Sequence, residues 1–131
     1  PLHIGPRYDG FLFLADSARN PPALAPHRHV ELEINLVVRG AITYVVDGRR
    51  FTFPARTLLW LFPAQVHQLV DRTADAQNYV AVFKPRLLAR ACREAWHRPL
   101  RRAKSPGDEV VHTELGPEEF ERMRREMAEL A

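Results

Sequence analysis

The chain has 131 residues, of which 46% are hydrophobic and 27% are charged, and its formal net charge is +3. This length and composition are typical of one soluble globular domain that buries a core of its own. No apolar run approaches the roughly 20 residues that span a bilayer, so we expect no membrane association. The excess of positive charge is too small to indicate nucleic-acid binding by itself. The single cysteine, Cys92, excludes an internal disulfide and favours the cytoplasm.

Short β-rich runs separated by turn-prone residues make up the amino-terminal part of the sequence. The runs are FLFLAD, VELEINLVV, AITYVV, RRFTF, TLLWLF, HQLV and QNYVAVF. Their regular spacing predicts an all-β sandwich or barrel, which we assign to residues 1–84. Asp47-Gly48 predicts a tight hairpin that pairs residues 41–46 with residues 49–53, because a two-residue turn of this kind needs positive φ.

The segment PHRHVELEINLVVRG, residues 26–40, alternates polar and apolar side chains. Successive side chains of a strand point to opposite faces. His29, Glu33 and Asn35 therefore share one face, and the apolar side chains share the other. The polar face either meets water as an ordinary sheet surface or lines a site.

Three imidazoles and a carboxylate of this sequence have the chemistry of metal ligands. His27, His29 and Glu33 have the same parity, and His67 follows a later strand and turn. Such side chains bind Zn, Fe, Mn, Ni or Cu at about 2.0–2.2 Å. A straight strand would separate His29 from Glu33 by ~13 Å. The chain must therefore bend between Pro26 and the start of the strand if these residues share an ion.

After residue 84 the periodicity changes to that of helices, and we assign residues 85–131 to a helical tail with a short strand near residues 110–114. Pro85 suits the first turn of a helix. A basic stripe follows it, formed by Arg86, Arg90, Arg93 and His97. Such a stripe is typical of a solvated helix face. A second helix is expected to start at Pro117, with acidic residues in its first turn that complement the helix dipole.

The last predicted helix carries a narrow apolar seam. Its members recur at steps of three and four and are Phe120, Met123, Met127 and Leu130. A seam of this width fits packing against one partner helix, which would make it a dimerisation surface. It fits packing against the chain's own barrel equally well.

Two stretches resemble the metal-binding motifs of the cupin superfamily. HRHVELE, followed by Gly40, is similar to the first motif, and TLLWLFPAQVHQLV is similar to the second. The resemblance implies a cupin-like β-barrel, mainly β and followed by carboxy-terminal helices. It also implies a divalent transition metal bound by His27, His29, Glu33 and His67. Zinc is the first choice for this metal, with nickel, manganese or iron as alternatives.

More narrowly, ELEINLVVRG, YVVDGRRFTFPARTLLWLFPAQVHQLV and VFKPRLL resemble the amino-terminal sensor domain of AraC-type transcription regulators. That resemblance implies a small-molecule effector, a homodimer, and a DNA-binding domain that we expect outside these residues, in a longer protein. Candidates for the mouth of the effector site are Asn35, Tyr44 and Trp60.

A function of another class stays open, that of a small cupin metalloenzyme such as a dioxygenase or an isomerase. A metal with an open coordination position would there bind substrate or O₂. Tyr44, Asp71 or His112 would then be candidates for an acid or base, although no residue stands out as catalytic. The gene sequence beyond Ala131 discriminates between the two functions.

Overall fold

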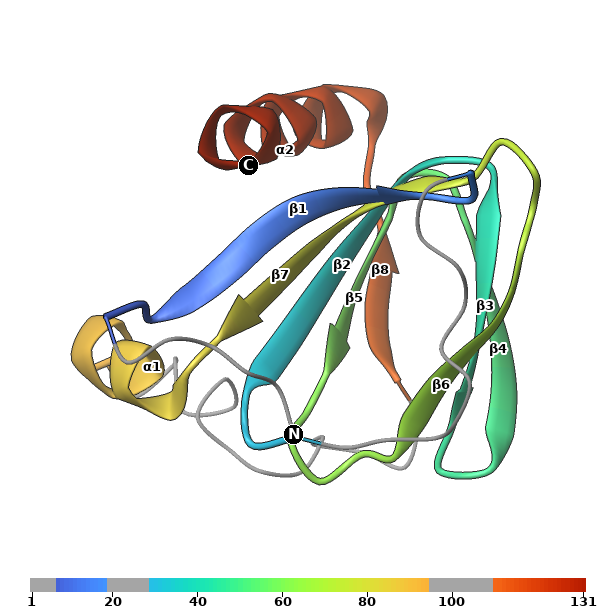
Figure 1. Ribbon diagram of the computed structural model, residues 1–131. Helices are drawn as coiled ribbons and strands as arrows, with labels where there is room; N and C mark the ends of the chain where they lie inside the picture. The colour runs from blue at the N-terminus through green and yellow to red at the C-terminus, as the bar shows by residue number, and fades with distance from the viewer. Residues whose placement is uncertain (1–6, 19–28, 95–109) are drawn as a thin grey trace.

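The computed structural model of the chain describes residues 7–18, 29–94 and 110–131. Within these ranges the chain forms eight strands and two helices (Figure 1). The strands are β1 (Gly10–Asp16), β2 (Leu32–Arg39), β3 (Ala41–Val46), β4 (Arg49–Pro54), β5 (Thr57–Leu61), β6 (His67–Arg72), β7 (Gln77–Phe83) and β8 (Val111–Glu114). The helices are α1 (Pro85–Ala91) and α2 (Pro117–Leu130), and neither is long and apolar enough to cross a membrane.

The strands form two antiparallel sheets around a common interior. One sheet has the order β1-β7-β2-β5-β8, and the other has the order β4-β3-β6. Val37 and Leu59 of the first sheet pack in one buried cluster with Ile42 and Phe53 of the second. The predicted fold, a cupin-like double-sheet barrel followed by carboxy-terminal helices, is confirmed.

The edge strand β8 comes from the carboxy-terminal part of the chain. It pairs with β5 from Thr57↔Glu114 to Trp60↔Val111. Residues 85–131 were expected to form a helical tail with a short strand near residues 110–114, and β8 lies at that place and joins the five-stranded sheet.

The predicted hairpin between β3 and β4 is confirmed. Asp47 and Gly48 have φ values of 49° and 81°, as a tight hairpin turn requires. The side chain of Asp47 also accepts a hydrogen bond from the backbone N–H of Val66 at 2.9 Å. The turn is thereby tied to the segment that leads into β6.

Strand β2 presents different side chains to its two sides. Glu33, Asn35 and Val37 are buried in the interior. Ile34 and Leu36 belong to a second apolar cluster, on the outer side of the five-stranded sheet. This outer surface needs a cover, because apolar area gains free energy when it is removed from water.

Helix α2 is that cover, and it lies outside the five-stranded sheet (Figure 1). Met127 is buried in the outer cluster, and Phe120 and Met123 pack against it. Leu130, the last member of the seam, is 78% exposed. The seam thus packs on the chain's own barrel, which is one of the two arrangements that the sequence left open.

Helix α1 is tied to the amino end of β1 by Asp9. The Arg86 guanidinium donates a hydrogen bond to Asp9 at 2.7 Å, and the Arg90 guanidinium donates to its other oxygen. Hydrogen bonds from Arg90 and Arg86 lower the pKa of Asp9. Two members of the basic stripe therefore anchor the helix while their side chains stay largely in water.

Replacing Met127 with Glu tests whether α2 packs on the chain's own sheet. We expect Met127→Glu to lower the free energy of unfolding by about 3 kcal/mol, because it buries a charge in an apolar cluster. The control Ala128→Glu adds the same charge at the next, exposed position and should change stability by less than about 0.5 kcal/mol. Urea unfolding measures both variants. A lower mass by light scattering with unchanged stability would instead show that Met127 packs on a second copy.

Replacing Gly40 tests the turn between β2 and β3. Its φ is +68°, and a Cβ there would lie 2.2 Å from the Thr73 hydroxyl and 3.0 Å from Ala76 Cα. We expect Gly40→Ala to destabilise the fold by about 3 kcal/mol through the left-handed backbone and the clash together. The control Gly48→Ala shares the positive φ but meets nothing within 4 Å, so it should lose only about 1 kcal/mol. Equal losses in urea unfolding would contradict the role of the close contact.

Candidate metal centre

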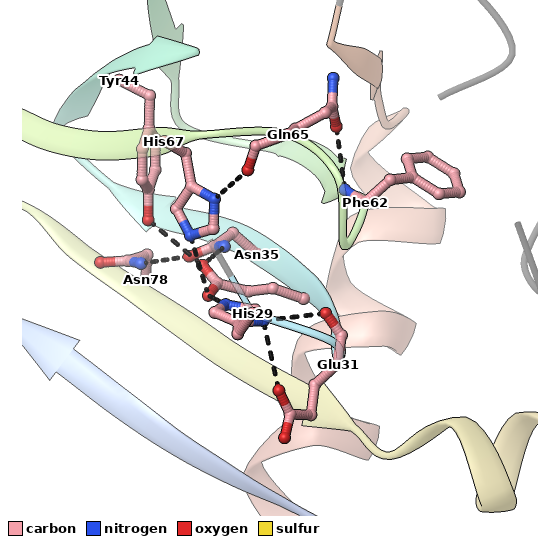
Figure 2. A network of polar contacts seen from close by, with 9 residues as sticks. His29, Glu31, Asn35, Tyr44, Phe62, Gln65, His67 and Asn78 are labelled. Atoms are coloured by element: carbon pink, nitrogen blue, oxygen red, sulfur yellow. Dashed lines mark hydrogen bonds and ion pairs between the residues drawn. The ribbon is translucent and has the colours of Figure 1, made fainter. Parts of the chain in front are cut away.

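Two imidazoles and a carboxylate meet in the barrel interior. His29 precedes β2, Glu33 lies on β2, and His67 is the first residue of β6. Their ligand atoms all lie within 4.8 Å of one another. Nε2 of His29 is 3.3 Å, and Nε2 of His67 is 3.7 Å, from the same Oε1 of Glu33. Figure 2 shows His67 and His29 next to each other. Their ring centroids are 5.1 Å apart, and the rings meet edge to face.

A bend just before β2 makes this meeting possible. The chain bends at Val30 and Glu31, and β2 begins at Leu32. The Val30 side chain is left 67% exposed, while His29 comes back over Glu33. The expected bend at the start of the strand is confirmed. His27, the other histidine of the first motif, lies outside the described residues.

Backbone carbonyl groups orient both imidazoles. Nδ1 of His29 donates to the carbonyl of Glu31 at 2.9 Å, and Nδ1 of His67 donates to the carbonyl of Gln65 at 3.1 Å (Figure 2). A carbonyl oxygen only accepts, so Nδ1 carries the hydrogen and Nε2 of the neutral ring carries a lone pair. Each Nε2 therefore points its lone pair at a Glu33 oxygen, which also carries lone pairs. The two atoms repel each other unless a proton or a metal ion lies between them.

Electrostatics favours a negative carboxylate at the centre of the site. Burial raises the pKa of Glu33, but the attraction of protonated His29 and His67 and the hydrogen bond from Asn35 outweigh it, and the pKa is lowered. Burial lowers the pKa of His29, but the hydrogen bond and charge of Glu33 outweigh that effect and raise it. Both shifts show that the carboxylate and a neighbouring cation stabilise each other.

The second oxygen of Glu33 is held by neutral polar groups. The Asn35 amide donates to Oε2 at 2.8 Å, and the Tyr44 hydroxyl donates to it at 3.4 Å. The Asn78 amide in turn donates to the Asn35 carbonyl at 2.8 Å (Figure 2). Oε1 is thus left facing the histidines, which suits it for a metal.

Gln65 and Asn78 support the site and were not predicted from the sequence. The side-chain oxygen of Gln65 accepts the backbone N–H of Phe62 at 2.9 Å, which shapes the turn before His67. Asn78 is a buried polar residue in the run QNYVAVF, whose last five residues carry no charged or amide side chain, and that pattern was a usable signal. Gln65 had no comparable signal, because its role depends on where the turn folds.

The three predicted effector residues do not share one site. Asn35 and Tyr44 lie in the interior beside Glu33. Trp60 pairs with Ile34 in the antiparallel register of β2 and β5. Directly paired residues of a sheet point to the same side, so Trp60 lies with Ile34 on the outer face, under α2.

The match to a known family agrees with this architecture. Residues 13–129 match the family model of the AraC-like ligand binding domain. Because the match covers most of the chain, the chain belongs to this family. A search of curated proteins found no match.

Solved structures with a similar fold include two of ToxT from Vibrio cholerae. That of strain SCE256 has a TM-score of 0.59 at 8% identity and covers 95% of this chain and 49% of that chain. The other has a TM-score of 0.56 at 7% identity and covers 90% of this chain and 46% of that chain. This chain therefore spans about half the length of ToxT. A Cupin 2 conserved barrel domain protein from Salinispora arenicola is 27% identical, with a TM-score of 0.47, and the match covers 71% of this chain and 81% of that chain.

A double-mutant cycle tests the polar network behind Glu33. We expect Asn35→Leu to destabilise the fold by about 2 kcal/mol, since Glu33 loses a donor and Asn78 loses its acceptor. Asn78→Leu should cost about 1–2 kcal/mol. The double variant should lose less than the sum by at least about 0.5 kcal/mol, because the shared hydrogen bond is lost only once. Additive losses in urea unfolding would contradict the network.

Proposed function

We propose that this domain senses a small-molecule effector in its barrel for an AraC-type transcription regulator. The observation that carries this proposal is the match of residues 13–129 to the AraC-like ligand binding domain. The whole protein would work in the cytoplasm and bind DNA through a separate carboxy-terminal domain.

We further propose that a divalent transition metal, zinc first, is part of the sensing site. His29, Glu33 and His67 would hold it, and His27 would complete the set that the cupin resemblance implies. The donor types support this assignment, because imidazole nitrogen and carboxylate oxygen suit Zn²⁺ and its neighbours. One carboxylate leaves a divalent ion with residual positive charge, so the bound metal would act as a Lewis acid toward an effector oxygen.

Buried polar groups of the barrel support a polar effector. Asn78 Oδ1 is buried and accepts no hydrogen bond from the described residues. Nε of Arg72, which pairs with the inward-facing Ile42, is also buried and donates none within them. Buried polar atoms normally have partners. An effector that reached either atom would satisfy it, with a donor for Asn78 Oδ1 or an acceptor for Arg72 Nε.

Tyr44 would contribute a neutral hydroxyl to the same site. Burial raises the pKa of its hydroxyl, and the nearby charge of Glu33 raises it further. The group therefore stays protonated at neutral pH and donates a hydrogen bond. It lies 3.4 Å from Glu33 Oε2, within reach of a molecule that contacts the centre.

Metal binding by untagged protein tests the centre directly. We expect calorimetry to show uptake of one Zn²⁺ per chain, and a rise in melting temperature that follows the linkage between binding and folding. His67→Ala should weaken binding by at least about 100-fold, because it removes a ligand. His112→Ala, which removes a histidine outside the cluster, should bind as the wild type does. Failure to take up Zn²⁺, Ni²⁺, Mn²⁺ or Fe²⁺ would refute the metal while leaving the sensor function in place.

A metalloenzyme remains the second candidate because of one observation. The described part of the cluster contains two histidines and one carboxylate, the ligand set of non-haem iron oxygenases, which keeps coordination positions open. Metal uptake alone does not separate this function from sensing.

DNA binding by the full-length gene product separates the two. We expect the whole protein to retard DNA from upstream of its own gene and to do so as a dimer by light scattering, since paired half-sites require two subunits in a fixed relation. Phe120, Met123 and Met127 pack on the chain's own barrel, so the dimer would need a further surface, such as the exposed end of α2 at Leu130. A whole protein that is monomeric and does not bind DNA would favour the enzyme.

A further inference from the structure

A pocket of about 260 Å³ lies between α2 and the outer face of the five-stranded sheet. Its floor includes Leu12, Ile34, Trp60 and Phe83, and its helix side includes Met123 and Glu126. Ile34 and Trp60 share one side of the sheet because they are paired, and it is the outer side, where both pack in the cluster under α2. The pocket is therefore separated by the sheet from the centre formed by Glu33 and the histidines.

The pocket has the size and lining of a small-ligand site. An apolar cavity of about 150 Å³ stays dry and binds benzene, so about 260 Å³ has room for an aromatic ring with a short side chain. Water gains little there, because it needs several polar partners and the lining is apolar apart from one residue. Met123 and Met127 add flexible, polarizable side chains that adapt to a ligand's shape.

The charge of the lining selects among apolar ligands. Among the described residues that line the pocket, Glu126 is the one that carries a charge, and it is exposed on the helix. Its carboxylate attracts a cation and repels a carboxylate. Trp60, on the floor, presents an aromatic ring of the kind that binds cations best. Both features favour the same class of ligand.

We propose that this pocket is a second binding site of the domain, specific for small hydrophobic cations. The ligand would place an aromatic or branched aliphatic group between the sheet and α2, and a protonated amine near Glu126. The site needs no metal and no interior effector, so it stands independently of the function proposed above. Because the ligand would contact both the sheet and α2, its binding would also stabilise the packing of α2 on the sheet.

The two methionines of the chain provide a direct test. They are Met123 and Met127, and both line the pocket. In protein labelled with ¹³C at the methionine methyl groups, we expect titration with 2-phenylethylamine to shift both signals. The matched anion 3-phenylpropanoate should bind at least about tenfold more weakly, because its charge is opposed to that of Glu126.

Two variants assign the selectivity to this site. Glu126→Gln should weaken binding of 2-phenylethylamine about three- to tenfold, whereas Glu129→Gln, on the same helix but outside the lining, should leave it unchanged. Ala81→Leu should abolish binding by filling the pocket, since Ala81 is one of its buried lining residues. If neither methionine signal shifts, if the amine and the acid bind equally well, or if Glu126→Gln has no effect, the proposal is wrong.

Discussion

Glu33 brings a carboxylate into the interior of the barrel, and several other features follow from the need to offset its burial. A buried and unpaired charge costs several kcal/mol. Two imidazoles face one of its oxygens, and an amide and a phenol donate to the other. Asn35 is itself held by Asn78. The network therefore reaches from the start of β2 to β7 and across to the second sheet, and it accounts for Asn35, Asn78 and the two histidines in a largely apolar interior.

The two faces of β2 contribute to two different sites. The inward face carries the candidate metal centre. The outward face is apolar and is covered by α2, which leaves a pocket beside Trp60 and Met123. A sheet with one polar and one apolar face thus separates two sites by the thickness of a single layer. Because α2 rests on that layer, the position of the helix depends on how well the outer cluster is packed.

The strands and the hairpin were predictable because their signals are local. Alternation with a period of two residues marked the strands, and Asp47-Gly48 marked the turn. The bend before β2 could be predicted from the reach of the chain, since His29 and Glu33 cannot meet on a straight strand. Trp60 was expected to line one site with Asn35 and Tyr44, but its side chain points to the opposite side of the sheet. The side to which Trp60 points depends on the register between β2 and β5, which the sequence does not show.

The sequence by itself determined the class of fold, the polar and apolar faces of β2, and the residue types of the candidate centre. These properties depend on side-chain chemistry and on spacing along the chain. Only the tertiary structure decided that His67 meets His29 and Glu33, that Asn78 and Gln65 support them, and that the seam of α2 packs on its own barrel. The hydrogen bonds of Gln65 to His67 and Phe62 are local but depend on how the turn folds. The other contacts join residues far apart in the chain, and their free energy is set by packing and burial in three dimensions.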